Sequence, residues 1–367
     1  MVDVPVENSF PSVVGTRLLM ETTALVRPGR ERGLGRYVRA CLDNARSLGC
    51  DTSELRVADR SGRTAEFLDL TERSVRAYFR KCDVFHVTHP HVWAVARSPT
   101  VVSILDLIPL DVGGYRQTGI KTKFFLGRAA QGRVVLTISE FSASRIADRF
   151  QIAPDRIVVA PLFPVQAFEE GRNSPPPEGF PERYVLAVVD MATPDPRKRP
   201  DWIEPLARGL KMAGLTLVVA GAGTDKGGAK LGKAIGVGRV SDSRLAQLAR
   251  YSVCFLYFSA YEGQGLPPLE AMTAGAAVVS TSNTAITEVV GSAGVLIQER
   301  AVDWTQAMAE DSNADATRRE LVDACVAVDR DESYRLRLRA NSVTQASLFS
   351  ERRFRDGLAY AYGMATC

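Results

Sequence analysis

The sequence predicts an α/β protein built from two doubly wound domains. The chain has 367 residues, which is more than one hydrophobic core usually contains and enough for two domains. Apolar runs of strand length alternate with segments of helical periodicity, which indicates parallel sheets covered by helices on both faces. With 46% apolar and 24% charged residues, the composition is that of a globular protein and lacks a disordered signature.

The first domain is expected at residues 1–168. Residues 35–48 place apolar side chains on one broad face at helical spacing. Short apolar runs predict the strands of this domain, at 13–20, 84–87, 101–105, 134–138 and 157–159.

A linker is expected at residues 169–182, because this stretch is rich in Pro and Gly and poor in core-forming residues. The alternation then resumes in a second domain, expected at 183–349. Its predicted strands are 184–189, 215–220, 253–258 and 277–280, and its predicted helices are 202–213 and 243–251. In open sheets of this kind, ligands gather at the carboxyl ends of the strands.

Composition and cysteine usage favour a cytoplasmic protein. The net charge of +4 is modest and gives no argument for nucleic acid as a partner. The six cysteines show no close pairing, so reduced core thiols are expected. No secretory leader and no apolar run of membrane-spanning length are recognisable.

The most informative motif is Tyr-Glu-Gly-Gln-Gly-Leu-Pro-Pro-Leu-Glu-Ala-Met at residues 261–272. Its two carboxylates, Glu262 and Glu270, flank a turn in which glycines permit close approach of a ligand. The adjacent prolines suit the start of a helix, predicted over 269–274, whose free amides and positive dipole end favour a phosphate. Phosphates on amides and hydroxyls on carboxylates would suit a sugar nucleotide, whereas the alternative is a surface loop with two solvated glutamates.

This motif resembles the Glu-x7-Glu signature of retaining glycosyltransferases of family 4, which have the GT-B fold. The resemblance implies two Rossmann-like domains that face a central cleft. It also implies that the last helix, at about 350–367, crosses back to the first domain. The implied activity is transfer of a hexose from a nucleoside diphosphate sugar to an acceptor hydroxyl, with the donor on the second domain and the acceptor on the first. The implied chemistry needs no cofactor and no metal.

Two further segments resemble phosphate-binding parts of this family. Gly33 and Gly35 open a helix, as in the glycine-rich loop that faces the donor phosphates, although a plain turn is the alternative. Residues 196–200, Pro-Arg-Lys-Arg-Pro, resemble a Pro-Arg-Lys-Asn or Pro-Arg-Lys-Gly segment whose lysine neutralises the donor pyrophosphate. Lys198 is therefore the expected main phosphate cation and Arg197 the second, unless the segment is only a solvated basic turn. The arginine that many relatives carry upstream is missing from residues 190–193.

Residues 238–242, Gly-Arg-Val-Ser-Asp, resemble the segment beside the nucleotide base. The backbone of Arg239 and Val240 would contact the base, and Ser241 or Asp242 would cap the next helix. By the same resemblance, Lys198, Arg197 and the amides near Gly265 and Leu266 would hold the pyrophosphate. Glu270 would bind the ribose hydroxyls, and Glu262 would bind the donor sugar and act in catalysis.

Residues 106–110, Asp-Leu-Ile-Pro-Leu, match a segment of mannosyltransferase-like members and place Asp106 in the acceptor cleft. The histidine that often precedes this aspartate is replaced by Leu105, so His89 is a candidate substitute, with His91 near it. The spacing of His86, His89 and His91, with no carboxylate nearby, argues against a metal site. Ser139 is expected to cap a helix.

Several questions stay open at this level. A sugar-nucleotide epimerase or phosphorylase, or a non-catalytic scaffold, would use the same fold. A dehydrogenase is a poor alternative, because the third glycine after Gly221 and Gly223 comes one position late, at Gly227. Residues 121–127 mix bases with aromatics and either touch an anionic membrane or form a half-buried helix. The donor base, the sugar (mannose is weakly favoured), the acceptor (saccharide, lipid-linked or small molecule), the linkage and the oligomeric state are undetermined.

Overall fold

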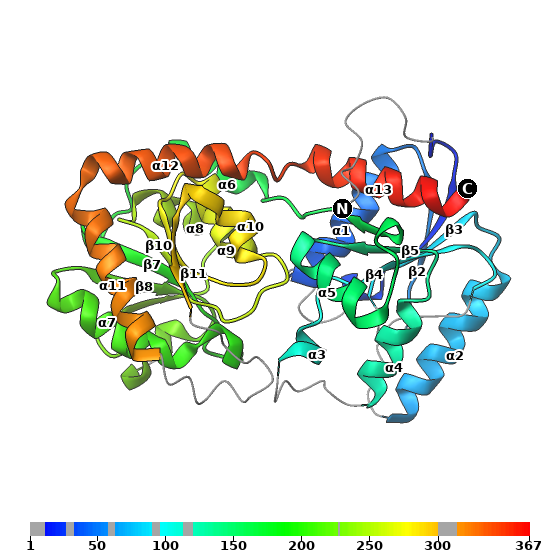
Figure 1. Cartoon of the computed structure of the whole chain (residues 1–367), viewed down its shortest axis with the longest axis horizontal. Coiled ribbons are helices and arrows are strands. Elements are labelled where there is room, and N and C mark those ends of the chain that lie inside the picture. The colour runs from blue at the N-terminus through cyan, green and yellow to red at the C-terminus, as the bar shows by residue number, and fades with distance from the viewer. Residues whose placement is uncertain are drawn as a thin grey trace. The chain divides into compact units, whose positions relative to one another are not determined.

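The chain folds into two compact units, each built on one parallel sheet (Figure 1). The computed structural model describes residues 12–26, 33–57, 63–89, 96–112, 120–226, 228–299 and 314–367. The first unit takes the described parts of Met1–Leu110, Tyr115–Leu162 and Glu351–Cys367. The second takes those of Asp111–Gly114 and Phe163–Ser350.

The first unit has a six-stranded sheet in the order β2-β1-β3-β4-β5-β6. Its strands are β1 (Arg17–Glu21), β2 (Asp51–Leu55), β3 (Val84–Val87), β4 (Thr100–Ser103), β5 (Val134–Thr137) and β6 (Ile157–Val159). Its helices are α1 (Gly33–Ser47), α2 (Arg63–Phe79), α3 (Ile108–Asp111, whose last residue groups with the second unit), α4 (Ile120–Ala129), α5 (Glu140–Phe150) and α13 (Glu351–Thr366). The strand expected at 13–20 begins only at Arg17, because Val13 and Val14 lie in the turn before it.

The last helix, α13, is part of the first unit. It packs on α1 and on β3 to β6, and Phe354, Leu358 and Tyr362 are buried there. Gly357 makes the closest approach, because a Cβ at this position would lie 2.8 Å from the Cβ of Ala160.

The second unit has a six-stranded sheet in the order β12-β11-β10-β7-β8-β9. Its strands are β7 (Tyr184–Val188), β8 (Thr216–Ala220), β9 (Ile235–Gly238), β10 (Phe255–Tyr257), β11 (Val278–Ser282) and β12 (Val295–Gln298). Its helices are α6 (Gln166–Glu170), α7 (Ile203–Met212), α8 (Asp242–Tyr251), α9 (Leu266–Thr273), α10 (Ile286–Val290), α11 (Ala314–Arg330) and α12 (Glu332–Ala346).

Both faces of the second sheet are buried. Because side chains alternate along a strand, Val185 faces one core and Leu186 the other. The core on the Val185 side is filled from α7 and α11, and the core on the Leu186 side from α8 and α9. Doubly covered parallel strands explain the near-continuous apolar runs of the sequence.

The second unit begins earlier than the composition of the chain indicates. The sequence places a linker at 169–182, but contacts divide the chain after Leu162. Phe168 is buried in the second core, and a Cβ at Gly171 would lie 2.4 Å from the Cβ of Ala246. Gly171 therefore serves close packing of the chain on α8 rather than linker flexibility.

Candidate active site

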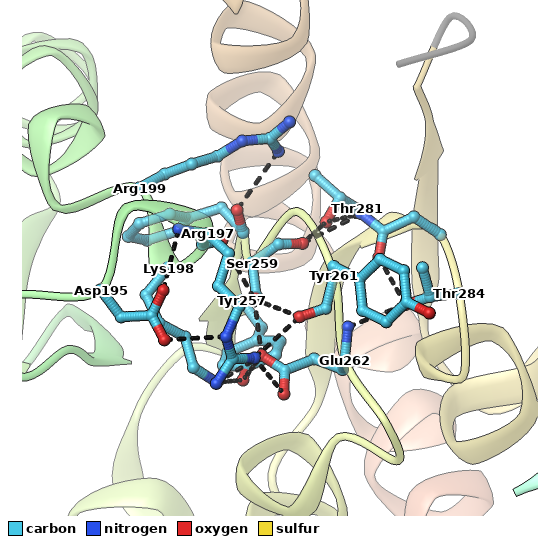
Figure 2. Close-up of polar contacts among 12 residues, drawn as sticks. Asp195, Arg197, Lys198, Arg199, Tyr257, Ser259, Tyr261, Glu262, Thr281 and Thr284 are labelled. Carbon is cyan, nitrogen blue, oxygen red and sulfur yellow. Dashed lines mark hydrogen bonds and ion pairs between the residues drawn. The ribbon is translucent and has the colours of Figure 1, made fainter. Parts of the chain in front are cut away.

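The candidate site lies in the second unit, where β7 and β10 end and α9 begins (Figure 2). Arg197 and Lys198 belong to a single 3₁₀ turn, Pro196–Lys198, which follows β7. Asp195 caps this turn by accepting a hydrogen bond from the backbone N–H of Arg197 at 3.2 Å. Glu262 follows β10, and the structure brings it against both basic side chains.

Four side chains converge on the carboxylate of Glu262, which is only 7% exposed. Its Oε1 accepts from Lys198 Nζ, from Tyr257 Oη at 2.8 Å and from Ser259 Oγ at 2.5 Å. Its Oε2 pairs with Arg197 Nη1 at 3.1 Å. We call Glu262, Lys198, Arg197 and Tyr257 the Glu262 cluster.

The cluster keeps Glu262 ionised. Burial alone would raise the pKa of Glu262, but the charges of Lys198 and Arg197, with hydrogen bonds from Lys198 and Ser259, lower it to about 2. At neutral pH this carboxylate is therefore a hydrogen-bond acceptor and not a proton donor.

The pKa of Lys198 is lowered, whereas an ion pair by itself would raise the pKa of a lysine. Burial lowers the pKa of Lys198, the attraction of Glu262 opposes this, and the nearby charge of Arg197 lowers it further. We take both members of the pair as charged at neutral pH, because one carboxylate shared by two cations is stabilised as the anion. Arg197 is also held by Asp195, whose Oδ2 accepts from its Nε at 2.8 Å.

Tyr257 belongs to the Glu262 cluster, but the sequence does not indicate this, because Tyr257 lies inside the apolar run of β10. Its hydroxyl accepts from Lys198 Nζ at 2.6 Å and donates to Glu262 Oε1. Burial, and then the charge of Glu262, raise the pKa of Tyr257 well above its ordinary value, so the phenol stays neutral. No periodicity distinguishes it from a core aromatic.

The turn after Glu262 has the geometry that its glycines and prolines predict. Gly265 is the N-cap of α9 at φ 94°, a left-handed conformation that favours glycine, and two prolines occupy the first turn. The helix starts at Leu266 and not at Leu269 as expected. Glu270 lies within α9 and is 7% exposed, so both carboxylates of the motif are nearly buried.

Backbone contacts fix the position of Glu262. Its N–H donates to Thr284 Oγ1 at 3.0 Å, from the loop after β11. Thr284 has φ 44°, which is uncommon for a β-branched residue. The carbonyl of the preceding Tyr261 accepts from Arg197 Nη1 at 2.8 Å, so the two loops of the site are joined by backbone as well as side chain.

The segment proposed to lie beside the base follows β9. Ser241 caps α8 by accepting from the N–H of Arg244 at 3.2 Å, which confirms the predicted cap and assigns it to Ser241. Arg239 is exposed and Val240 is half-buried. Gly221 serves packing, because a Cβ there would lie 2.1 Å from the carbonyl oxygen of Val189. Gly227 lies outside the described residues.

The remaining predicted site residues belong to the first unit. Gly33 and Gly35 lie in the first turn of α1, and Gly33 is exposed. Asp106 follows β4 and accepts a hydrogen bond from the N–H of Ile108 at 3.0 Å. His89 is half-buried after β3, and His91 lies outside the described residues. Ser139 caps α5 as predicted.

His86, the third histidine, is a buried structural residue. Its Nδ1 lies 2.9 Å from Tyr362 Oη of α13, and its Nε2 lies 2.8 Å from Ser103 Oγ. Burial lowers the pKa of His86 to about 3. In the part of the chain that the structure describes, no group of His, Cys, Asp and Glu side chains could hold a metal ion. No helix among the described residues is long and apolar enough to span a bilayer.

Two Rossmann-like units with parallel sheets define the GT-B class of glycosyltransferase folds, and this chain has that fold. Residues 182–311 match the family of glycosyl transferases group 1. The matched segment covers much of the second unit and includes all residues of the Glu262 cluster. Among curated proteins, the O-antigen chain mannosyltransferase B of Escherichia coli is 31% identical over 218 residues, which are 52% of this chain and 54% of that protein.

Further relatives agree with this class. The serotype-specific mannosyltransferase WbdA of Escherichia coli is 25% identical over 280 residues, covering 68% of this chain and 32% of that protein. The chain thus spans about half, or less, of the length of these curated relatives. Among solved structures, sucrose-phosphate synthase from Thermosynechococcus elongatus has a TM-score of 0.65 at 15% identity, over 93% of this chain and 96% of that one. WaaG, a glycosyltransferase involved in lipopolysaccharide biosynthesis, has a TM-score of 0.64 at 14% identity, over 94% and 98%.

Proposed function

We propose that this protein is a retaining glycosyltransferase that moves a hexose, with mannose favoured, from a nucleoside diphosphate sugar to an acceptor hydroxyl in polysaccharide biosynthesis. The observation that carries the proposal is the Glu262 cluster, where two cations and an ionised carboxylate meet beside the first turn of α9. The match to glycosyl transferases group 1 supports the class of reaction, and similarity to two mannosyltransferases supports the sugar.

The diphosphate of the donor would bind at the positive end of the site. Lys198 and Arg197 supply charge, and the amides at the start of α9, near Gly265 and Leu266, supply donors along the helix dipole. Lys198 would then offset charge that develops on the leaving phosphate, which is a common source of rate acceleration. In this proposal the neutralisation needs no metal ion.

The carboxylates would hold the sugar parts of the donor. Glu262, ionised and nearly buried, would accept hydrogen bonds from hydroxyls of the transferred hexose. Glu270 would do the same for the ribose. In the retaining route, the bond from C1 to phosphate oxygen breaks and the bond from C1 to acceptor oxygen forms on the same face. The acceptor proton passes to the leaving phosphate, so no protein nucleophile is required.

The first unit would bind the acceptor, with Asp106 and His89 near the carboxyl ends of β4 and β3, and Gly33 and Gly35 would face the donor phosphates. A lipid-linked acceptor would bring the protein to a membrane surface, in keeping with a cytoplasmic enzyme that is peripheral to the bilayer. The exposed Lys123 and Phe124 of α4 are the proposed contact, while Leu126 and Ala129 are buried and anchor the helix.

The decisive experiment incubates the wild-type protein with GDP-mannose or a UDP-hexose and a saccharide acceptor, with and without EDTA. We expect a new glycoside whose anomeric configuration, read by NMR, equals that of the donor. Replacing Lys198 by Met should abolish it. An isomerised sugar nucleotide would identify an epimerase instead. Failure of every nucleoside diphosphate to raise the Tm would support a non-catalytic scaffold, because binding at 100 times Kd should stabilise the fold by about 2.7 kcal/mol.

A further inference from the structure

A buried ion pair adjoins the Glu262 cluster. Arg199, the residue after Lys198, is 5% exposed, and Glu299, which follows β12, is 7% exposed. Arg199 Nη1 and Glu299 Oε1 are 2.5 Å apart. Neither residue is part of the donor site proposed above.

Arg199 occupies an unusual backbone position. Its φ is 50°, in the left-handed region that glycine and asparagine tolerate best. Asn or Gly, which stands here in the segment that residues 196–200 resemble, would suit this conformation. Here the arginine side chain is held instead: its Nη1 donates to the Phe258 carbonyl at 3.3 Å, and its guanidinium stacks 4.1 Å from the Trp202 ring centroid.

The carboxylate of Glu299 also holds the loop after β11, which contacts Glu262. Glu299 Oε2 accepts from Asn283 Nδ2 at 2.5 Å, and that amide also donates to the Ser259 carbonyl at 2.9 Å. The next residue, Thr284, accepts the backbone N–H of Glu262. One oxygen of Glu299 therefore secures the loop of Lys198, and the other secures the loop that positions Glu262.

We infer that Glu299 and Arg199 are positioning residues that set the Lys198 and Glu262 side chains against each other. The inference rests on the proposed function, since it assigns a purpose within that site. Stability alone is a weak explanation, because a buried ion pair is often no better than an apolar pair of similar volume. An arginine with a left-handed backbone conformation directly after Lys198 is better explained by a role in positioning the Lys198 side chain.

The replacement Glu299→Gln tests this arrangement most sharply. Both carboxylate oxygens accept hydrogen bonds, whereas an amide offers one acceptor and one donor group, so one of the two loops must lose its bond. We expect turnover to fall by about 100-fold, the effect of misplacing reacting groups by about 1 Å. The complementary Arg199→Asn suits the left-handed backbone and removes the charge, and it should give a similar loss of turnover.

The double variant, Arg199→Asn with Glu299→Gln, separates positioning from stability. It removes both charges, so no unpaired charge stays buried and the Tm should recover towards the wild-type value. Turnover should stay low if the pair positions the site. Turnover that recovers together with the Tm would overturn the inference. Arg183→Asn is the control, because it breaks an ion pair with Asp329 on the same unit in which the Arg183 side chain is exposed, and it should leave turnover unchanged.

A second readout does not depend on sugar transfer. The rate at which an amine-acylating reagent modifies Lys198, measured by mass spectrometry relative to the exposed Lys211, reports whether Lys198 stays packed against Glu262. Faster relative labelling in Glu299→Gln supports positioning even if the wild-type protein transfers no sugar, in which case only the proposed function fails. Unchanged labelling, with active wild-type protein, overturns the inference and leaves the proposed function intact.

Discussion

Replacing Glu262 by Gln removes the nearly buried charge that Lys198 and Arg197 share. The amide keeps the shape of the side chain and can still accept from Lys198, but Lys198 and Arg197 lose their carboxylate. We therefore expect both a loss of stability in the second unit and a large loss of turnover.

Two estimates of the stability loss agree. A pKa lowered from 4.5 to about 2 corresponds to about 3 kcal/mol, at about 1.4 kcal/mol for each factor of ten in the acid constant. Removing one partner of a buried ion pair typically costs about 3–5 kcal/mol. Because the folded-state pKa is lowered, this stabilisation is fully present above about pH 4.5 and is lost as the pH falls towards 2.

Hydrogen exchange read by mass spectrometry is the suitable assay, because unfolding of a two-unit chain is not a single transition. Peptides from β7 and β10 should exchange about 100-fold faster in Glu262→Gln than in the wild type at pH 7, after correction for intrinsic rates. The difference should shrink at pH 3. Glu182→Gln, at an exposed glutamate before β7, is the matched control. An equal difference at both pH values, or an equal effect of the control, would refute the reasoning.

Two more predictions concern Tyr257 in the second unit and His86 in the first. Tyr257→Phe removes a hydrogen bond that Tyr257 donates to Glu262 and one that it accepts from Lys198. The second unit should lose about 1–3 kcal/mol of stability, measured by hydrogen exchange of β10, and turnover should fall. Unchanged turnover would show that Tyr257 does not belong to the site. His86 has its pKa lowered to about 3 by burial, so only the unfolded state takes up its proton as the pH falls from 6.5. The first unit should lose about 4 kcal/mol between pH 6.5 and 3, and His86→Gln should flatten that dependence; an unchanged pH profile in this variant would contradict it.

The central strands of both sheets could be predicted from sequence, and the edge strands mostly could not. The run at 84–87 is the central strand β3 as expected, and the run at 157–159 is β6, an edge strand that was nevertheless predicted. The three strands that sequence analysis missed, β2, β9 and β12, all lie at sheet edges. An edge strand is covered less completely, so β2 reads Asp-Thr-Ser-Glu-Leu and its polar residues look like a loop.

Part of the candidate site could be proposed from the sequence. Glu262 and Lys198 were identified separately, on motifs that lie far apart in the sequence, but their direct contact depends on the β7–β10 pairing and has no local signal. Arg199 stood out only as a departure from a familiar motif. Its partner Glu299 has no motif at all, and the two meet because β12 and β7 end at the same edge of one sheet.

The position of α13 has a consequence for how the protein is made. The first unit is the first to be synthesised, yet Phe354, Leu358 and Tyr362 of its core come after the entire second unit. During translation, the part of the first sheet that α13 covers, over β3 to β6, therefore stays exposed until the second unit has been synthesised. Chaperones that shield apolar sheet surface would act in that interval, and truncation within α13 should leave a nascent-like first unit beside a folded second one.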